Sequence, residues 1–186
     1  MWVFWNDSQG TQHKCKRQQL LNSCVPACMA MIVRSVSTTN EGYDEDNART
    51  HLKSVMPQGV QGSAAMTFIN TGVALNYVSS ALKKKNINDG VKRLITVNAT
   101  NLKNYFSVQK PGIVGVTLTL PNNTTINHAV VCKGEISLNN FLFICPGYGP
   151  HEVPANNITS FGLTDLWQLG LPNVTASPTG DAVTFI

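Results

Sequence analysis

The segment 24–36, CVPACMAMIVRSV, constrains this chain most, because it is apolar on nearly every side. A helix of that kind must be buried all round instead of resting on a surface with one face in water. Asn22 and Ser23, directly before it, favour the start of a helix, and Pro26 stands where a first-turn proline is tolerated. The sequence therefore predicts a buried helix around which the rest of the chain is arranged.

The order of patterns along the chain predicts the fold class. The first half is mostly helical, with helices at 43–56, within 63–85 and at 101–108, a loop at 58–62 and one strand at 92–97. The second half is mostly extended, with strands at 112–120, 128–133, 140–145 and 151–153, and a last short helix at 164–169. Helices followed by antiparallel strands are typical of an α+β fold.

Length and composition limit the domain organisation and the partners. The 186 residues are expected to form a single domain, 1–186, with an N-terminal extension at 1–17 and a C-terminal tail at 171–186 that is either an added strand or a flexible end. The chain is 42% apolar and 13% charged, as in ordinary globular proteins. The chain lacks the basic stripe with interleaved aromatic residues that nucleic-acid binding requires. It also lacks an apolar stretch long enough to span a bilayer and an N-terminal secretion signal.

Cys24 is the first candidate for chemistry. The five cysteines are an odd number without paired spacing, which does not indicate a disulfide framework. Cys24 opens the predicted buried helix, where unpaired amides and the helix dipole favour an anion and lower the pKa of a thiol. Such a thiolate is a nucleophile. The alternative is that Cys24 is simply a small buried residue.

A thiolate nucleophile needs a base, and imidazole is suited to that role near neutral pH. Of the four histidines, only His128 opens an apolar strand, where its ring can be held rigidly at a sheet end. A purely structural histidine is the alternative. Acyl transfer also needs donors for the developing oxyanion, and a side-chain amide from Gln18 or Gln19 lies a few residues before Cys24.

Residues 18–32, QQLLNSCVPACMAMI, resemble the active-site segment of the bacteriocin-leader-processing (double-glycine) peptidases, a papain-like family. Gln18 stands six residues before Cys24, as in that family's pattern. Further resemblances follow in the same order, with the family's histidine strand at 127–131, its next strand and turn at 141–149 and its closing helix at 161–167. The resemblance implies a papain-like α+β fold, with a helical lobe whose buried nucleophile helix packs on an antiparallel sheet.

The resemblance also implies roles for single residues. Gln18 would be the oxyanion donor, Cys24 the nucleophile and His128 the general base and then acid, with no metal or cofactor. The family's third residue is an Asp before a Pro, but here Cys145 precedes Pro146. A thiol is a weak acceptor, so Cys145 itself, Asn140 or Asp165 are the open candidates for orienting His128.

The sequence thus predicts a cysteine peptidase that cleaves a peptide or protein substrate through a Cys–His thioester. The resemblance implies cleavage after small residues such as paired glycines. The compact length suggests a stand-alone protein, either an effector or toxin or a processing protease, in the bacterial cytoplasm or exported without an N-terminal signal. Alternatives are an inactive peptide-binding module, deamidation or transpeptidation through the same thioester, and a zinc site of Cys24, Cys28 and either His128 or Cys145. The oligomeric state is left open.

Overall fold

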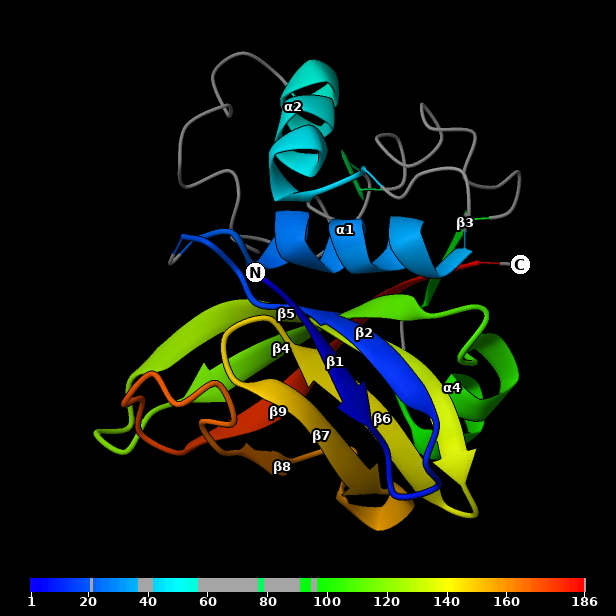
Figure 1. Cartoon of the computed structure of the whole chain (residues 1–186). Coiled ribbons are helices and arrows are strands. Elements are labelled where there is room, and N and C mark those ends of the chain that lie inside the picture. The colour runs from blue at the N-terminus through cyan, green and yellow to red at the C-terminus, as the bar shows by residue number, and fades with distance from the viewer. Residues whose placement is uncertain (21, 37–41, 57–76, 79–90, 95–96, 186) are drawn as a thin grey trace.

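The computed structural model describes residues 1–20, 22–36, 42–56, 77–78, 91–94 and 97–185. Helix α1 (Cys24–Val36) lies across a curved antiparallel sheet, and α2 (Glu45–Val55) lies on its other side (Figure 1). The predicted α+β class is confirmed, because helices from the first half pack on antiparallel strands from the second. The predicted loop 58–62 and nearly all of the predicted helical segment 63–85 lie outside the described residues.

The main sheet is built on a meander of four strands, each paired with the next. They are β4 (Gly112–Thr119), β5 (Thr125–Ser137), β6 (Asn140–Cys145) and β7 (Gly149–Pro154). The strand β9 (Val174–Phe185) pairs with β4, and β3 (Val91–Leu94) and β8 (Phe161–Leu163) both pair with β9. The segment 171–186 therefore contributes an added strand, the first of its two expected forms.

The predicted extension 1–17 is a hairpin of β1 (Trp2–Asn6) and β2 (Gln12–Lys16). Two contacts fix it to the helices. Lys16 is 1% exposed, and its Nζ lies 2.8 Å from Oδ1 of Asp44, the N-cap residue of α2. The guanidinium of Arg34 on α1 lies 4.2 Å from the ring centroid of Trp2. The hairpin is thus part of the packed structure.

The predicted burial of the first helix is confirmed, since every residue from Cys24 to Val33 is buried. Side chains of a strand alternate between faces, and here both faces of the sheet are covered. On β5 and β6 the residues that pack toward α1 are Ala129, Val131, Leu142 and Ile144. The residues on the opposite face of these strands are Val130, Cys132, Phe141, Phe143 and Cys145. They form a second core with residues of α4 (Ala99–Tyr105) and β8.

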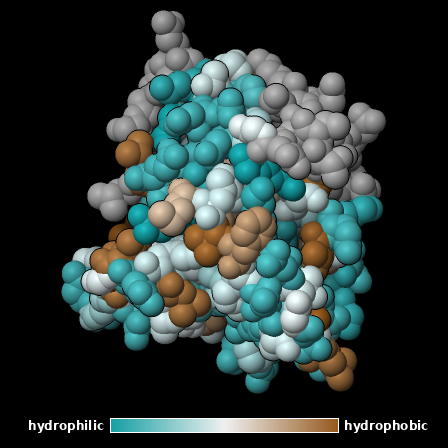
Figure 2. All heavy atoms as spheres, viewed as in Figure 1, coloured by the Kyte–Doolittle hydropathy of each residue, from teal (hydrophilic) through white to brown (hydrophobic). Residues whose placement is uncertain are grey.

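Helix α2 covers α1 with a narrow apolar face, in which Ala48 and Leu52 are buried. It begins with a capping box between Asp44 and Asn47. In the view of Figure 2, hydrophilic side chains cover most of α2, and apolar ones are scattered over the hairpin and sheet. One side of α1 is therefore shielded by an amphipathic helix and the other by the sheet.

The predicted helix at 164–169, and with it the expected closing helix at 161–167, is wrong. The segment forms β8 followed by turns, held by tertiary hydrogen bonds. The N–H of Leu166 donates to the C=O of Tyr148 (2.9 Å), and Nε1 of Trp167 donates to the C=O of Pro146 (3.1 Å). Gln168 has a φ of 57°, which a right-handed helix does not allow. These bonds to the turn after β6 outweigh the local helical pattern.

Gly134 marks a shift of register between Cys132 and Glu135 and has a φ of +76°. A Cβ atom there would collide with the backbone carbonyl of Phe106 and lie 2.9 Å from Cα of Ser107. We expect Gly134→Ala to lower the free energy of unfolding by roughly 2–4 kcal/mol, measured by urea denaturation.

Gly162→Ala is the matched control, because Gly162 is exposed on β8 and a Cβ atom there would meet nothing within 4 Å. Its effect should stay within about 0.5 kcal/mol. Equal unfolding midpoints for the two variants would show that the backbone at Gly134 is not constrained in this way.

Candidate functional site

The start of α1 is fixed by a tight turn that sets the position of Cys24, which is 2% exposed. Oγ of Ser23 accepts a hydrogen bond from the N–H of Leu20 (3.1 Å) and donates one to its C=O (2.9 Å). The C=O of Ser23 accepts the N–H of Ala27 (3.0 Å). Pro26 has no N–H, which costs nothing in a first turn. The predicted cap residue thus begins the helix, but its hydroxyl binds backward to Leu20.

The sequence predicts that His128 is the first residue of a strand, but it is the fourth residue of β5. It is the first residue of β5 that is buried. Its Nε2 lies 3.2 Å from Sγ of Cys145 at the end of β6. Val131 pairs with Ile144, which puts Cys145 opposite Val130 and on the same face as His128. Two neighbouring antiparallel strands therefore bring these two side chains into contact.

Burial keeps both members of this contact neutral. It lowers the pKa of His128 to about 4, so the imidazole carries no charge at neutral pH. It raises the pKa of Cys145 to about 12, although the N–H groups of Gly147 and Tyr148 donate to the sulfur and act in the opposite direction. The result is an uncharged imidazole held by an uncharged thiol.

Gln18 lies in the segment between β2 and α1 and borders the same place. Its N–H donates to the C=O of Pro146 (3.0 Å), and its Nε2 donates to the C=O of Leu20 (2.9 Å). A Cβ atom on Gly147 would lie 3.7 Å from Oε1 of Gln18 and 3.8 Å from Cε1 of His128. The side chains of Gln18 and His128 therefore both adjoin Gly147, whereas the side chain of Gln19 is exposed.

Cys24 interacts electrostatically with Cys28 and with Cys145. Burial is the main cause of the raised pKa of Cys28 and of Cys145, and a negative charge on Cys24 would raise both further. The three thiols are thus within electrostatic reach of one another. Cys145, which lies within this reach of Cys24, is also the residue whose sulfur contacts Nε2 of His128.

The other two candidates for orienting His128 are engaged elsewhere. Asn140 begins β6, at the opposite end from Cys145, and its Nδ2 donates to Oε2 of Glu152 (2.7 Å). Oδ2 of Asp165 accepts the N–H of Leu171 (2.9 Å). Of the three candidates, Cys145 is the one in contact with Nε2 of His128.

The remaining cysteines are fully buried, and none of the five forms a disulfide bond. Burial raises the pKa of Cys15 and of Cys132 to about 12, and that of Cys28 well above its ordinary value. Among the residues that the structure describes, no group of three or more His, Cys, Asp or Glu is placed to hold a metal ion.

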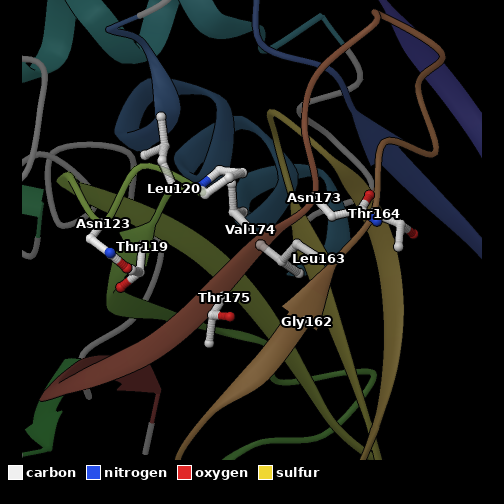
Figure 3. A pocket seen from close by; sticks show the side chains of 10 residues that line it. Thr119, Leu120, Asn123, Gly162, Leu163, Thr164, Asn173, Val174 and Thr175 are labelled. Carbon is white, nitrogen blue, oxygen red and sulfur yellow. The ribbon is translucent and has the colours of Figure 1, made fainter.

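A pocket separate from this site lies at the turn between β4 and β5 (Figure 3). It is lined by Thr119, Leu120, Pro121, Asn123, Gly162, Leu163, Thr164, Asn173, Val174 and Thr175. The lining contains no histidine, cysteine or charged side chain, so it offers no group for acid–base chemistry. Of the helices in the described part of the chain, none has the length and hydropathy that crossing a bilayer requires.

Two residues beside the candidate site carried no signal in the sequence. Gly147 looked like an ordinary turn glycine after Pro146, and Glu45 like one more charged residue of a surface helix. The structure buries Glu45 completely and places Gly147 next to the side chains of Gln18 and His128. Only contacts between distant segments distinguish them.

Comparison with known proteins gave a structural similarity but no family. No protein-family model matches the chain, and no curated protein sequence matches it. The chain is similar to the crystal structure of the avirulence protein AvrPphB of Pseudomonas, at 9% identity and a TM-score of 0.35, over 85% of this chain and 90% of that one. A similarity at this TM-score assigns neither a fold nor an activity to the chain.

The burial of His128 predicts a pH dependence of stability. Its pKa is about 4 in the folded chain against an ordinary 6.5, so the unfolded chain binds the proton first as the pH falls. The contribution of His128 to the free energy of unfolding is therefore fully present above pH 6.5. It is lost as the pH falls to about 4, and the loss amounts to up to about 3 kcal/mol.

Urea unfolding of the wild type and of His128→Gln between pH 7 and pH 4 measures this contribution. The stability curve of the variant should be flatter over that interval. Parallel curves would mean that His128 is accessible to protons in the folded chain.

Proposed function

We propose that this chain is a papain-like cysteine peptidase, with Cys24 as nucleophile, His128 as base, Gln18 as oxyanion donor and Cys145 in the third position. The observation that carries the proposal is the anchoring of His128. Its Nε2 meets Cys145 at 3.2 Å, while its ring adjoins Gly147 beside Gln18. A base held on one nitrogen leaves the other ring nitrogen to exchange a proton with a nucleophile.

In the proposed reaction the thiol of Cys24 loses its proton to Nδ1 of His128 as its sulfur attacks the carbonyl carbon of a peptide bond. The oxyanion is met by Nε2 of Gln18 and the backbone N–H of Cys24. The C–N bond then breaks, and His128 returns the proton to the leaving amine. Water, activated by the same imidazole, hydrolyses the thioester and releases Cys24.

The arrangement of the elements supports the papain-like proposal. The nucleophile opens a buried helix, and the base and third residue lie on adjacent antiparallel strands. The order Gln18, Cys24, His128, Cys145 is the order in the double-glycine peptidases, which the sequence resembles. The proposed substrate is a peptide or protein chain, as suits a processing peptidase or an effector.

The thiol in the third position favours a second candidate, a catalytically weak or inactive peptide-binding module. The sulfur of Cys145 already accepts two backbone N–H groups and keeps its own proton, since its pKa is about 12. It is therefore better placed to donate to Nε2 of His128 than to accept from it. That bond would put the imidazole proton on Nδ1, where the base needs a lone pair.

The nucleophile–base pair predicts selective modification of one cysteine. At pH 7 iodoacetamide should alkylate Cys24 and spare the other four, because they are fully buried and burial raises their pKa values. In His128→Ala the rate at Cys24 should fall about tenfold or more, because the base is lost. Mass spectrometry of each cysteine gives both rates.

Turnover of a random peptide library by the wild type, with Cys24→Ala as the control, separates a peptidase from a binding module. A Cys24 that stays unreactive in the folded chain would eliminate the catalytic proposal. A reactive Cys24 without cleavage would favour the weak or inactive module.

Substitution at the third position should change the reactivity in opposite directions. In Cys145→Asn the amide oxygen can accept the Nε2 proton, which leaves Nδ1 as the base, so we expect alkylation of Cys24 to accelerate about tenfold or more. Cys145→Ala removes the anchor and should slow it. If both variants match the wild type, Cys145 does not orient His128.

A further inference from the structure

Glu45, the first residue of α2, has a carboxylate that no solvent reaches, with 0% of the residue exposed. Its oxygens accept the backbone N–H of Gln19, at 3.0 Å for Oε2 and 3.3 Å for Oε1. Nη2 of Arg49, one turn further along α2, lies 3.0 Å from Oε1. A buried carboxylate is costly unless it is paired and hydrogen-bonded. Here one of the partners is the backbone of the segment that leads to Cys24.

The segment 18–20 is held by its three consecutive backbone N–H groups. Each of them donates to an acceptor in a different part of the fold. The N–H of Gln18 donates to Pro146 in the turn after β6, and that of Leu20 donates to Ser23 at the start of α1. Between them, the N–H of Gln19 donates to Glu45 on α2. The Gln18 side chain thus starts from a backbone that the sheet and both helices fix together.

The start of α2 is itself fixed, so Glu45 is a rigid support. Asp44 caps the helix and binds Nζ of the buried Lys16, which ends β2 two residues before Gln18. Nε of Arg34 on α1 donates to the C=O of Tyr43 (2.7 Å). A shift of Glu45 would therefore require α1, α2 and the hairpin to move relative to one another.

We propose that Glu45 is a positioning residue, which sets the place of the Gln18 amide for the oxyanion without touching the substrate. The inference rests on the proposed function, in which Gln18 is the oxyanion donor. Donors of this kind act only when they are held within about 0.5 Å of the productive position, and a misplacement of about 1 Å can cost about 100-fold in rate.

Two reagents separate this role from a general effect on the nucleophile. Iodoacetamide alkylates the thiolate of Cys24 without forming an oxyanion, whereas p-nitrophenyl acetate acylates it through one and releases p-nitrophenolate. In the full chain carrying Glu45→Gln, we expect alkylation within about twofold of wild type and acylation about tenfold slower or more. Gln18→Ala should give the same pattern, and Cys24→Ala serves as the blank.

Glu135→Gln is the matched control. The Glu135 carboxylate likewise accepts a backbone N–H, from Asn139 at 2.8 Å, and binds a basic side chain, with Nζ of Lys103 at 2.9 Å. It lies toward the far end of β5 from His128, so both rates should stay at the wild-type value. Glu45→Asp, which keeps the charge but withdraws it by one methylene, decides the question if Glu45→Gln does not fold, and the same selective loss is expected.

The possible results distinguish this inference from the proposed function. A wild-type Cys24 that reacts with neither reagent overturns the peptidase proposal itself. A reactive wild type whose Glu45 variants keep both rates, or lose both in the same proportion, overturns the positioning role alone. Failure of both Glu45 variants to fold also overturns it, because Glu45 would then be required for the fold and not for the placement of Gln18.

Discussion

The rest of the structure depends on the burial of α1 on all sides. A helix with ten consecutive buried residues needs one cover on each side, and the chain supplies the sheet on one and α2 on the other (Figure 1). The sheet needs a second cover in turn, because its opposite face is equally apolar. The two cores therefore follow from one helix that has no face for water. The start of that helix carries Cys24, whose charge would reach Cys145, the residue in contact with His128.

Burial also sets the electrostatic character of the candidate site. The same desolvation that lowers the pKa of His128 raises the pKa values of Cys28 and Cys145, so these groups are neutral near pH 7. A carboxylate in the third position would stabilise an imidazolium, and a thiol does not. Chemistry at such a site depends on which ring nitrogen carries the proton, and hydrogen bonds around Cys145 decide that.

The segment before Cys24 shows how the fold joins distant parts of the chain at one place. Its three successive N–H groups reach the turn after β6, the residue directly before α1 and a buried carboxylate of α2. Glu45 can serve there because α2 is capped and held to the hairpin by Lys16. A charged residue in a polar-looking helix thus has a place in the interior.

The sequence by itself determined the elements whose signal is local. The run 24–36 was predicted with its observed bounds, and the β-branched run at 112–120 and the apolar run at 140–145 were predicted as strands within one residue, because burial and side-chain shape act within the segment. Gln18, Cys24, His128 and Cys145 could be singled out from spacing and resemblance. Only the tertiary structure decided that 164–169 is not a helix, that 1–17 is a hairpin, that Cys145 meets His128 and that Glu45 is buried. Each of these depends on hydrogen bonds or packing between residues far apart in the chain, and no local pattern encodes their partners.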